Sequence, residues 1–585
     1  MKYTAKNHKK LIRNISKPSD AREYLHILAE WGDKPAIFWK ENGENKEISF
    51  YDFSEMCWHF GAGLRKQFGN VPGENVRIAI IGETSVNWLA AYMGTLAAGY
   101  VAIPMDKELA PAEIHKFLES VDACALVHSA TFRETFGNIA AEHATVKFAI
   151  PFGTDAEQSD IVIPYNTILE NGKVHYEACL ALMDTDEENE DIAWLTEPVD
   201  TERMAEMLFT SGTTGTSKCV MLCQKNIFSV ISNATECTEF TENDVLVSVL
   251  PIHHTYELAC FFAGLTLGAQ FCINDSLRNV MKNFKEYRPT ALVLVPLFVN
   301  TMYKKILSEA NRSGKGKVLE LGLKLAGVAG KVGIDLSNTL FKDVRDAFGG
   351  RLVKIICGGA RLDPSLIPTF DRFGIAIYEG FGITECSPLV AVTPYYKRKC
   401  GSVGPAVPCC EIRIDGTNLT DDGFQSGEIQ VKGDNVMLGY YNNPEANADA
   451  FTEDGWFRTG DVGHLDKDGY LYITGRMKSV IVLDNGKNVF PEEIEEYLEP
   501  ISLIAESVVV GREEDGVTVL TAVVFPNAEA ASAAGLDSAA AQTEIQKQIT
   551  ALNKQLPSFK QIHKIEFRKT EFEKTTSRKI KRHLV

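Results

Sequence analysis

The chain has 585 residues, of which 45% are hydrophobic and 24% are charged, and its formal net charge is −18. This length and composition are typical of a globular protein with several cores, and they exclude a largely disordered chain. The acidic balance argues against a general nucleic-acid binder, because phosphate backbones are bound by basic surfaces. The thirteen cysteines form no CxxC motif, which favours free thiols in a reducing compartment.

Residues 1–17 are basic and polar and have no apolar core, so they do not resemble a secretory signal. The longest uncharged stretch, residues 84–105, reaches the roughly 20 residues that span a bilayer. It contains Asn87, Gly94 and Pro104, so we expect a buried helix followed by a strand. We therefore expect a cytoplasmic protein, with transient contact at a membrane surface left open.

Short β-rich runs alternate with longer helical patterns along the chain. Residues 76–81 predict a strand, residues 86–98 a helix and residues 99–104 a second strand. Apolar runs of this length between Gly, Pro and polar residues are typical of buried strands in α/β layers. Further strands are predicted in the same way at residues 291–296, 352–357 and 375–378.

The first chemical motif is MLFTSGTTGTSKCV at residues 207–220. Apolar residues lead into a loop that is rich in hydroxyl groups and glycine and that ends at a lysine. Glycine lets backbone N–H groups approach an anion, hydroxyls donate hydrogen bonds and lysine adds a positive charge. The loop therefore fits a polyphosphate, although its spacing is not that of a Walker A loop. The alternative is an ordinary Ser/Gly surface turn.

The second motif is YEGFGITECSP at residues 378–388, downstream of CGGA at residues 357–360. Phe381 is flanked by glycines and could stack on a planar base. Thr384 could donate to a phosphate, and Glu385 could hold Mg²⁺, a hard cation that prefers carboxylate oxygen. The alternative for this segment is a tight strand-to-loop turn.

The third motif is GWFRTGDVGHLDKDGYLYITGRMK at residues 455–478. Asp461 lies between turn glycines, and its carboxylate could accept two hydrogen bonds from ribose hydroxyls. Arg476 ends a strand-like run. The alternative is a hairpin held by an Asp–Arg ion pair.

Together these three motifs resemble the adenylate-forming superfamily, which includes acyl-CoA synthetases, firefly luciferase and peptide-synthetase adenylation domains. The resemblance extends from about residue 48 to Lys579. It implies an α/β fold with a large, multi-subdomain N-terminal adenylation domain, residues 1–475. A small, mobile α+β C-terminal domain, residues 476–585, would close over ATP, with the hinge at Lys478.

The resemblance also implies which residues bind ATP. The hydroxyl-rich loop matches the family's contact with the β- and γ-phosphates: Thr210, Ser211, Gly212, Thr213, Thr214, Gly215 and Lys218. The second motif and CGGA match contacts with the AMP moiety: Gly359, Ala360, Glu379, Gly380, Phe381, Gly382, Thr384 and Glu385. Glu385 also matches the family's Mg²⁺ contact. Asp461 matches the ribose contact, and Arg476 matches the arginine near ribose and phosphate.

The last motif departs from the family pattern Pro-x-Thr-x-x-Gly-Lys. Residues 573–579 read EKTTSRK, so Lys579 matches, whereas Glu573 replaces the proline and Arg578 replaces the glycine. The resemblance assigns Lys579 the catalytic role in adenylation. Because arginine carries a steric penalty wherever glycine would adopt a positive φ, the backbone geometry beside this lysine is left open.

Around the acyl pocket the chain resembles long-chain fatty-acid:CoA ligases. LPIHHTYEL at residues 250–258 is similar to the segment that lines their acyl channel, which assigns His254 and Tyr256 to that channel. The alternative for His254 is a satisfied core histidine. Residues 305–340 resemble a basic, helix-rich insertion of long-chain members. Residues 483–495, with Gly486, resemble the loop that enters during thioester formation.

We therefore expect an AMP-forming acid–thiol ligase. It would use ATP and Mg²⁺ to convert a fatty acid to acyl-AMP and pyrophosphate, and would then pass the acyl group to CoA with release of AMP. Two alternatives stay open. The acceptor could be acyl carrier protein, whose acidic helices suit the nine Lys and Arg residues between 559 and 585. The chain could also be a catalytically impaired acyl-AMP-binding protein, because of Arg578.

Overall fold

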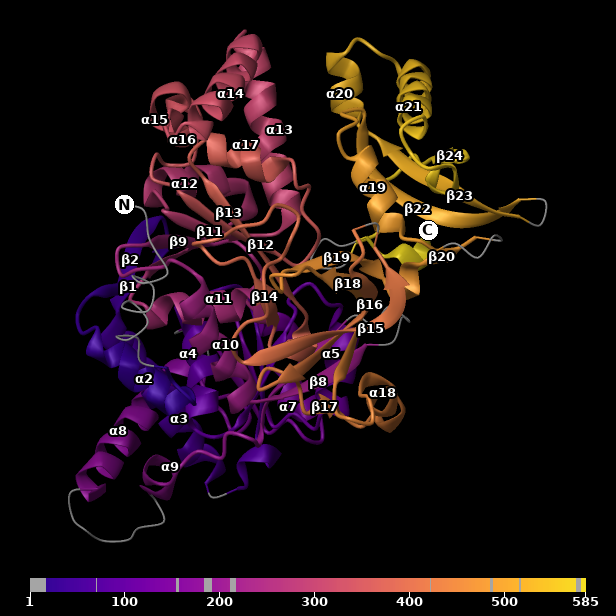
Figure 1. Cartoon of the computed structure of the whole chain (residues 1–585). Coiled ribbons are helices and arrows are strands. Elements are labelled where there is room, and N and C mark those ends of the chain that lie inside the picture. Colours follow the sequence, from indigo (N-terminus) through magenta and orange to yellow (C-terminus); the bar gives the residue numbers. More distant parts are fainter. Residues whose placement is uncertain are drawn as a thin grey trace. The chain divides into compact units, whose positions relative to one another are not determined.

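The computed structural model (Figure 1) describes residues 17–69, 71–153, 157–183, 192–210, 217–420, 422–483, 488–514, 517–574 and 580–585. The chain divides into two compact units. Unit 1 comprises residues 1–210, 218–411 and 432–448, and unit 2 comprises residues 211–217, 412–431 and 449–585. The two units together form a mixed α/β fold, as the sequence predicts.

Unit 1 contains an eight-stranded sheet in which the six middle strands run parallel and the two edge strands run antiparallel. Its order is β14(Leu389–Val392), β13(Ala376–Gly382), β12(Lys354–Gly358), β11(Ala291–Leu294), β9(Val245–Ser248), β10(Gln270–Ile273), β1(Pro35–Glu41) and β2(Glu44–Ser49). The helices between residues 255 and 372 are α11(Thr255–Thr266), α12(Val280–Tyr287), α13(Pro296–Arg312), α14(Gly316–Lys331), α15(Ser337–Leu340), α16(Lys342–Ala347) and α17(Leu366–Arg372). Apolar side chains of these strands and helices form one core with Leu292, Ile355 and Phe370 fully buried.

The second sheet of unit 1 has seven strands, in the order β17(Gly439–Tyr440), β8(Lys218–Cys223), β7(Met204–Thr210), β4(Val101–Met105), β3(Arg77–Ile81), β5(Ala125–His128) and β6(Phe148–Pro151). Its strands from β7 to β6 are parallel, whereas β8 returns antiparallel to β7 and β17 antiparallel to β8. The remaining helices of unit 1 include α2(Ala21–Glu30), α3(Phe50–Phe68), α4(Val86–Ala97), α5(Pro111–Ser120), α6(Arg133–Phe136), α7(Ile139–Glu142), α8(Tyr165–Met183), α9(Ala193–Thr196) and α10(Gln224–Cys237). Helix α3 packs against α4 and α8, and α10 packs against α11.

The predicted elements at residues 76–104 are confirmed as β3, α4 and β4. Helix α4 begins after Ser85, whose hydroxyl accepts the backbone N–H of Trp88 at 3.2 Å, as a helix N-cap does. Every residue of α4 except Asn87 is buried, so the uncharged stretch is a core helix followed by a strand. Across the described part of the chain, no helix combines the length and hydropathy that crossing a membrane requires.

Unit 2 is built on smaller sheets. A four-stranded antiparallel sheet has the order β15(Cys410–Leu419), β16(Gln425–Gly433), β18(Phe457–Leu465) and β19(Leu471–Arg476). Helix α18(Pro444–Ala450), most of which belongs to unit 1, precedes β18. A three-stranded sheet has the order β22(Ile504–Glu514), β23(Val517–Pro526) and β24(Lys564–Phe567), and a short ribbon pairs β20(Ile481–Val482) with β21(Asn488–Val489). Helices α19(Pro491–Leu498), α20(Ala528–Ala533) and α21(Ser538–Asn553) complete this part. The domain boundary predicted near residue 476 falls inside unit 2 and stays a prediction.

Candidate active site

The hydroxyl-rich loop connects two paired strands of unit 1. Thr210 ends β7 and Lys218 begins β8, and these two residues face each other in the antiparallel register. The Thr210 hydroxyl donates to the carbonyl oxygen of Lys218 at 3.3 Å. The middle of the predicted loop lies outside the described residues: Ser211, Gly212, Thr213, Thr214 and Gly215. Both ends of the loop are therefore held together where the strands of the hairpin meet the loop.

Tyr440 connects the end of this loop to the second motif. It lies on β17, where it pairs with Val220 of β8, and its ring centroid is 4.4 Å from Lys218 Nζ, which is a cation–π contact. The Tyr440 hydroxyl donates to Glu385 Oε1 at 2.9 Å. Burial, reinforced by the charge of Glu385, raises the pKa of Tyr440 well above its usual value, so the hydroxyl stays protonated and remains a donor.

The predicted roles of the second motif did not include Tyr440. The sequence signal that could have found it is the segment GEIQVKGDNVMLGYY at residues 427–441, which also resembles the adenylate-forming family. The pairing of β17 with β8 explains its importance, because it places the Tyr440 side chain next to Lys218 and Glu385.

Thr384 and Glu385 lie on a single 3-10 turn, Thr384–Cys386, between the antiparallel strands β13 and β14. The backbone N–H of Ile383 donates to the carbonyl of Pro388 at 2.9 Å, which closes the turn. A second bond anchors Glu385, because its carbonyl accepts the N–H of Met437 at 2.9 Å. The strand-to-loop turn expected as the alternative is therefore present, and it carries both residues.

Six predicted AMP contacts lie at the ends of neighbouring strands, namely Gly359, Ala360, Glu379, Gly380, Phe381 and Gly382. The first two follow β12 and the other four lie on β13, which runs parallel to β12 with Glu379 beside Cys357. The carboxyl ends of parallel strands are where α/β sheets bind ligands. Phe381 is only 8% exposed, so its stacking on a base stays a prediction.

The predicted Mg²⁺ contact is one carboxylate. In the described ranges, no group of three or more His, Cys, Asp or Glu side chains is arranged to hold a metal ion. A magnesium ion bound with a nucleotide needs only one or two protein carboxylates, because phosphates and water supply its other ligands. Glu385, half-buried and held by Tyr440 through Oε1, fits that requirement.

In unit 2, Asp461 and Arg476 lie opposite each other on the antiparallel strands β18 and β19. Arg476 Nε lies 2.9 Å from Asp461 Oδ1, so the ion-paired hairpin that we considered as the alternative exists. Asp461 is 4% exposed whereas Arg476 is exposed. The pair does not exclude a ribose contact, because a carboxylate can accept several hydrogen bonds.

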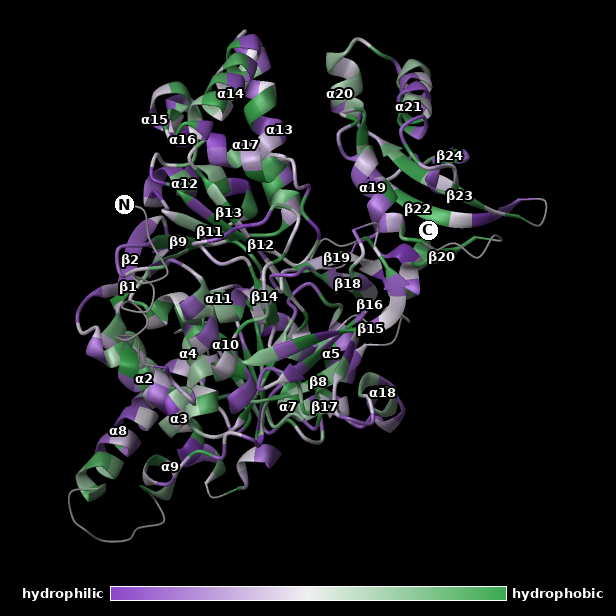
Figure 2. Ribbon diagram, viewed as in Figure 1, coloured by the Kyte–Doolittle hydropathy of each residue, from purple (hydrophilic) through white to green (hydrophobic). Residues whose placement is uncertain are grey.

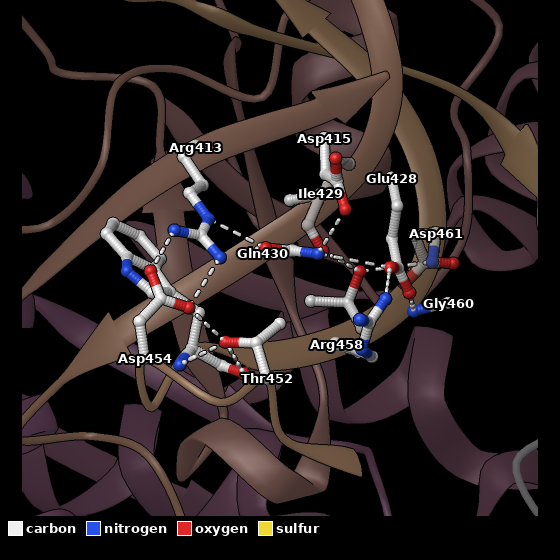
Figure 3. Close-up of polar contacts among 12 residues, drawn as sticks. Arg413, Asp415, Glu428, Ile429, Gln430, Thr452, Asp454, Arg458, Gly460 and Asp461 are labelled. Carbon is white, nitrogen blue, oxygen red and sulfur yellow. Dashed lines mark hydrogen bonds and ion pairs between the residues drawn. The ribbon is translucent and has the colours of Figure 1, made fainter. Parts of the chain in front are cut away.

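A polar network braces the part of β18 that precedes Asp461, where the pairing with β16 shifts register (Figure 3). Glu428 accepts the backbone N–H of Gly460 at 3.2 Å with one carboxylate oxygen. Its other oxygen accepts Arg458 Nη1 at 3.2 Å and the amide of the fully buried Gln430 at 3.3 Å. Arg413 extends the network with a 2.7 Å bond to Gln430 Oε1. A hydrogen-bonded network centred on the buried Gln430 and Glu428 favours one local conformation.

The two predicted acyl-channel residues have structural partners. The Tyr256 hydroxyl lies within donating distance of the carbonyls of Leu294, at the end of β11, and Ile356, in the middle of β12, at 3.3 and 3.2 Å. His254 is the N-cap residue of α11, and its ring centroid lies 4.2 Å from that of His253. Next to Tyr256, burial raises the pKa of Glu257 to about 8, so this carboxyl is largely protonated at neutral pH.

A small cavity lies among α4, α10 and α11. It is lined mainly by apolar residues, with one buried carboxyl, and its lining includes Tyr92, Glu206, Ile227, Ile231, Leu258 and Phe262. His254 and Tyr256 are not among the lining residues. Their assignment to an acyl channel stays a prediction.

Three predicted residues belong to the C-terminal part of unit 2. Lys478 is exposed on the 3-10 turn Met477–Ser479, between β19 and β20. Gly486 and the catalytic candidate Lys579 lie outside the described residues. Lys574, the second residue of the last motif, pairs in an antiparallel bridge with Ile580, which directly follows the motif.

Several basic residues of the C-terminus have acidic partners within unit 2. Lys560 lies 2.5 Å from Glu493, Lys564 lies 2.8 Å from Glu514, and Arg582 pairs with Glu495. Part of the basic charge of the C-terminus is therefore paired within the fold, and these side chains are not all available to bind a ligand.

Comparison with known proteins decides the family. Residues 26–441 match the family model described as AMP-binding enzyme, and residues 478–585 match the model described as AMP-binding enzyme C-terminal domain. The chain belongs to the AMP-binding enzyme family. This family assignment confirms the resemblance to adenylate-forming enzymes, with a large N-terminal and a small C-terminal domain.

Relatives within the AMP-binding family are named as fatty-acid ligases. The chain is 29% identical over 459 residues to long-chain-fatty-acid–CoA ligase FadD15 of Mycobacterium tuberculosis, covering 74% of this chain and 71% of that protein. It is 28% identical over 503 residues to long-chain-fatty-acid–CoA ligase 6 of Mus musculus, covering 81% and 70%. It is 26% identical over 565 residues to long-chain-fatty-acid–[acyl-carrier-protein] ligase AEE15 of Arabidopsis thaliana, covering 86% and 75%.

Solved structures of the family share this fold. ATP-bound MatB from Rhodopseudomonas palustris aligns with a TM-score of 0.71 at 25% identity, over 97% of this chain and 98% of that one. The anthranilate CoA ligase AuaEII aligns with a TM-score of 0.73 over 98% of both chains, and its 18% identity supports the fold alone.

Proposed function

We propose that this member of the AMP-binding family activates a fatty acid in two steps. In the first, a carboxylate oxygen attacks the α-phosphorus of ATP, which forms acyl-AMP and releases pyrophosphate. In the second, a thiol attacks the acyl carbon and AMP leaves. The observation that carries the proposal is the contact chain from Lys218 through Tyr440 to Glu385, because it joins the polyphosphate loop to the carboxylate proposed for Mg²⁺.

The first step depends on positioning and on neutralising phosphate charge. Lys218 and the hydroxyl-rich loop would hold the β- and γ-phosphates. Thr384 would donate to the α-phosphate, and Glu385 would hold Mg²⁺, which offsets negative charge on the phosphates when it is bound. We assign the remaining nucleotide contacts to Asp461 and Arg476 for the ribose and to Phe381 for the base.

Lys579 is the proposed catalytic cation of the first step. Its ammonium group would stabilise the charge that builds up as the two anions approach each other. For the second step, rotation at Lys478 would remove Lys579 and admit the loop that contains Gly486.

The substrate class is a fatty acid. Two fatty-acid CoA ligases from distant organisms are among the relatives, and they support this choice. We assign Mg²⁺, ATP and CoA as the other reactants.

A second candidate differs only in the acceptor. The Arabidopsis carrier-protein ligase aligns over 86% of this chain, which is more than either CoA ligase does. Transfer to acyl carrier protein is therefore the alternative to transfer to CoA.

The proposal is tested with the purified full chain, ATP, Mg²⁺ and a series of acids from acetate to oleate. Pyrophosphate release should rise with apolar chain length, and thioester formation with free CoA or with purified carrier protein then identifies the acceptor. Absence of pyrophosphate release with every acid would favour a catalytically impaired acyl-AMP-binding protein.

The role of Lys579 is tested in the same assay. Lys579→Ala should lower pyrophosphate release by about 100-fold or more, since removing one preorganised electrostatic contact costs this much. It should largely spare thioester formation from pre-made acyl-AMP. Lys581→Ala, a lysine two residues away, serves as the matched control. Wild-type pyrophosphate release by Lys579→Ala would overturn the assignment.

A further inference from the structure

Helix α14 of unit 1 exposes a continuous row of apolar side chains. Val318, Leu321, Leu325, Val328 and Val332 are 67%, 58%, 50%, 67% and 72% exposed. Since each residue advances an α-helix by about 100°, the five side chains fall within an arc of about 80°. Figure 2 shows hydrophobic residues recurring along α14 between hydrophilic ones. We call this row the outer stripe of α14.

The outer stripe is separate from the face that holds α14 in the fold. Leu319 and Leu323 pack on the core of unit 1, where Ala326 is buried, and Gly322 lies against the ring of Phe341. Through this inner face, α14 packs against α13, α15 and α17. The outer stripe therefore adds nothing to the core, and its exposure costs free energy because apolar area stays in water.

A row of lysines runs beside the outer stripe. Lys317, Lys324 and Lys331 are spaced by seven residues, which places them on one side of the helix, next to the apolar arc. Lys324 contacts the exposed Glu320 at 2.7 Å. Residues 296–350 contain nine Lys and Arg against five Asp and Glu, although the whole chain carries a net charge of −18. The basic charge is thus concentrated where the apolar side chains are exposed.

We propose that the outer stripe of α14 docks the protein on the surface of an anionic lipid bilayer. The valine and leucine side chains would enter the interfacial region, and the lysine row would contact lipid phosphates. Apolar residues beside a lysine-rich face are the pattern of helices that lie in the plane of a membrane interface. The proposal goes beyond the function proposed above, because binding of this kind requires no catalysis.

The composition of α14 favours lipid over a protein partner. Protein interfaces are enriched in Tyr, Trp and Arg and depleted in Lys. The sequence of α14, GKVLELGLKLAGVAGK, contains no aromatic residue and no arginine. Its lysines have long apolar stems that can lie along the stripe while the ammonium group stays in the headgroup layer.

The test is flotation of the full chain with phosphatidylcholine vesicles that contain about 30% phosphatidylglycerol, compared with pure phosphatidylcholine vesicles. The wild type should float with the anionic vesicles, and binding should fall about tenfold on the neutral ones or at high salt. Val318→Glu combined with Val328→Glu should lower binding to anionic vesicles by about tenfold or more, because two charges enter the apolar contact.

Helix α8 offers a matched control. Val174 and Leu180 on α8 are 65% and 42% exposed, but acidic residues, Glu170 and Glu177, accompany them. Val174→Glu combined with Leu180→Glu should float like the wild type. Both double variants should keep wild-type thermal unfolding, since all four side chains are exposed.

Two results would overturn the proposal. One is flotation that does not depend on the stripe: either the wild type does not float with anionic vesicles, or the Val318→Glu, Val328→Glu variant floats equally well. The other is a wild-type dimer in gel filtration that this variant converts to a monomer without any vesicle binding, which would assign the stripe to a second copy of the chain. Neither readout uses catalysis, so both are independent of the proposed ligase activity.

Discussion

Among single residues, Tyr440 bears most directly on the proposed chemistry. Its ring contacts Lys218 and its hydroxyl donates to Glu385, so one side chain positions two charged groups that are 167 residues apart in the sequence. A hydrogen bond to a charged group contributes about 1.5–3 kcal/mol. The orientation of the Glu385 carboxylate should therefore depend on this hydroxyl.

We predict that Tyr440→Phe lowers kcat/KM for pyrophosphate release by about tenfold or more, because the bond to Glu385 is lost while the ring over Lys218 remains. The loss should be largest at low Mg²⁺ concentration, since Glu385 is the proposed Mg²⁺ contact. The measurement is pyrophosphate release as a function of Mg²⁺ concentration.

The neighbouring residue supplies the control for this variant. The Tyr441 hydroxyl accepts Arg77 Nη1 at 2.9 Å, so Tyr441→Phe removes the same group from a contact that does not involve Glu385. Equal effects of the two variants at every Mg²⁺ concentration would show that Tyr440 acts only through stability.

At the scale of elements, the sequence predicts buried strands and capped helices best. The runs at residues 76–81 and 86–98 became β3 and α4 within a residue or two, because apolar period and a serine N-cap mark them locally. Register between distant strands has no such local signal. The pairing of β17 with β8, and hence the place of Tyr440, depends on contacts between residues 220 apart and could not be predicted.

The same limit applies to the sheet that carries Asp461. Its strands are partly exposed and bring together buried polar side chains such as Gln430 and Glu428, so neither an apolar run nor a strict alternation identifies the pairing. The Asp461–Arg476 pair was foreseeable because both residues flank one hairpin. The Glu428–Gly460 bond was not, because it crosses strands 32 residues apart.

The turn after β13 yields a prediction at this scale. A Cβ on Gly382 would lie 2.2 Å from the carbonyl oxygen of Pro388, and this backbone cannot give way without moving the turn that holds Thr384 and Glu385. Gly382→Ala should therefore destabilise the protein by about 1–3 kcal/mol, as overpacking does, and should lower pyrophosphate release further. Thermal unfolding and the pyrophosphate assay measure the two effects.

Gly380, two residues earlier on the same strand, is the matched comparison. A Cβ there would lie 3.7 Å from its nearest neighbours, which is an ordinary contact, so Gly380→Ala should unfold at the wild-type temperature. If Gly382→Ala is as stable and as active as Gly380→Ala, the close approach to Pro388 does not constrain the turn.

At the scale of the whole molecule, the two proposed steps place opposite demands on the C-terminal domain. In the proposal, acyl-AMP formation uses Lys579, and thioester formation uses the loop with Gly486 instead. One backbone arrangement cannot serve both, so the proposal requires a change of backbone dihedrals at a few residues. Lys478 suits this role, because it is exposed on a short turn and a change there disturbs no core.

We predict that Lys478→Pro separates the two steps. Proline fixes φ near −65°, so the chain should keep one backbone arrangement at this position. One half-reaction should then fall by about tenfold or more while the other changes little, because losing a conformational step slows only the reaction that needs it. The two measurements are pyrophosphate release from ATP and thioester formation from pre-made acyl-AMP. Lys478→Ala, which removes the same charge but leaves φ free, should retain both. Equal losses in both half-reactions of Lys478→Pro, or no loss in either, would place the hinge elsewhere in the chain.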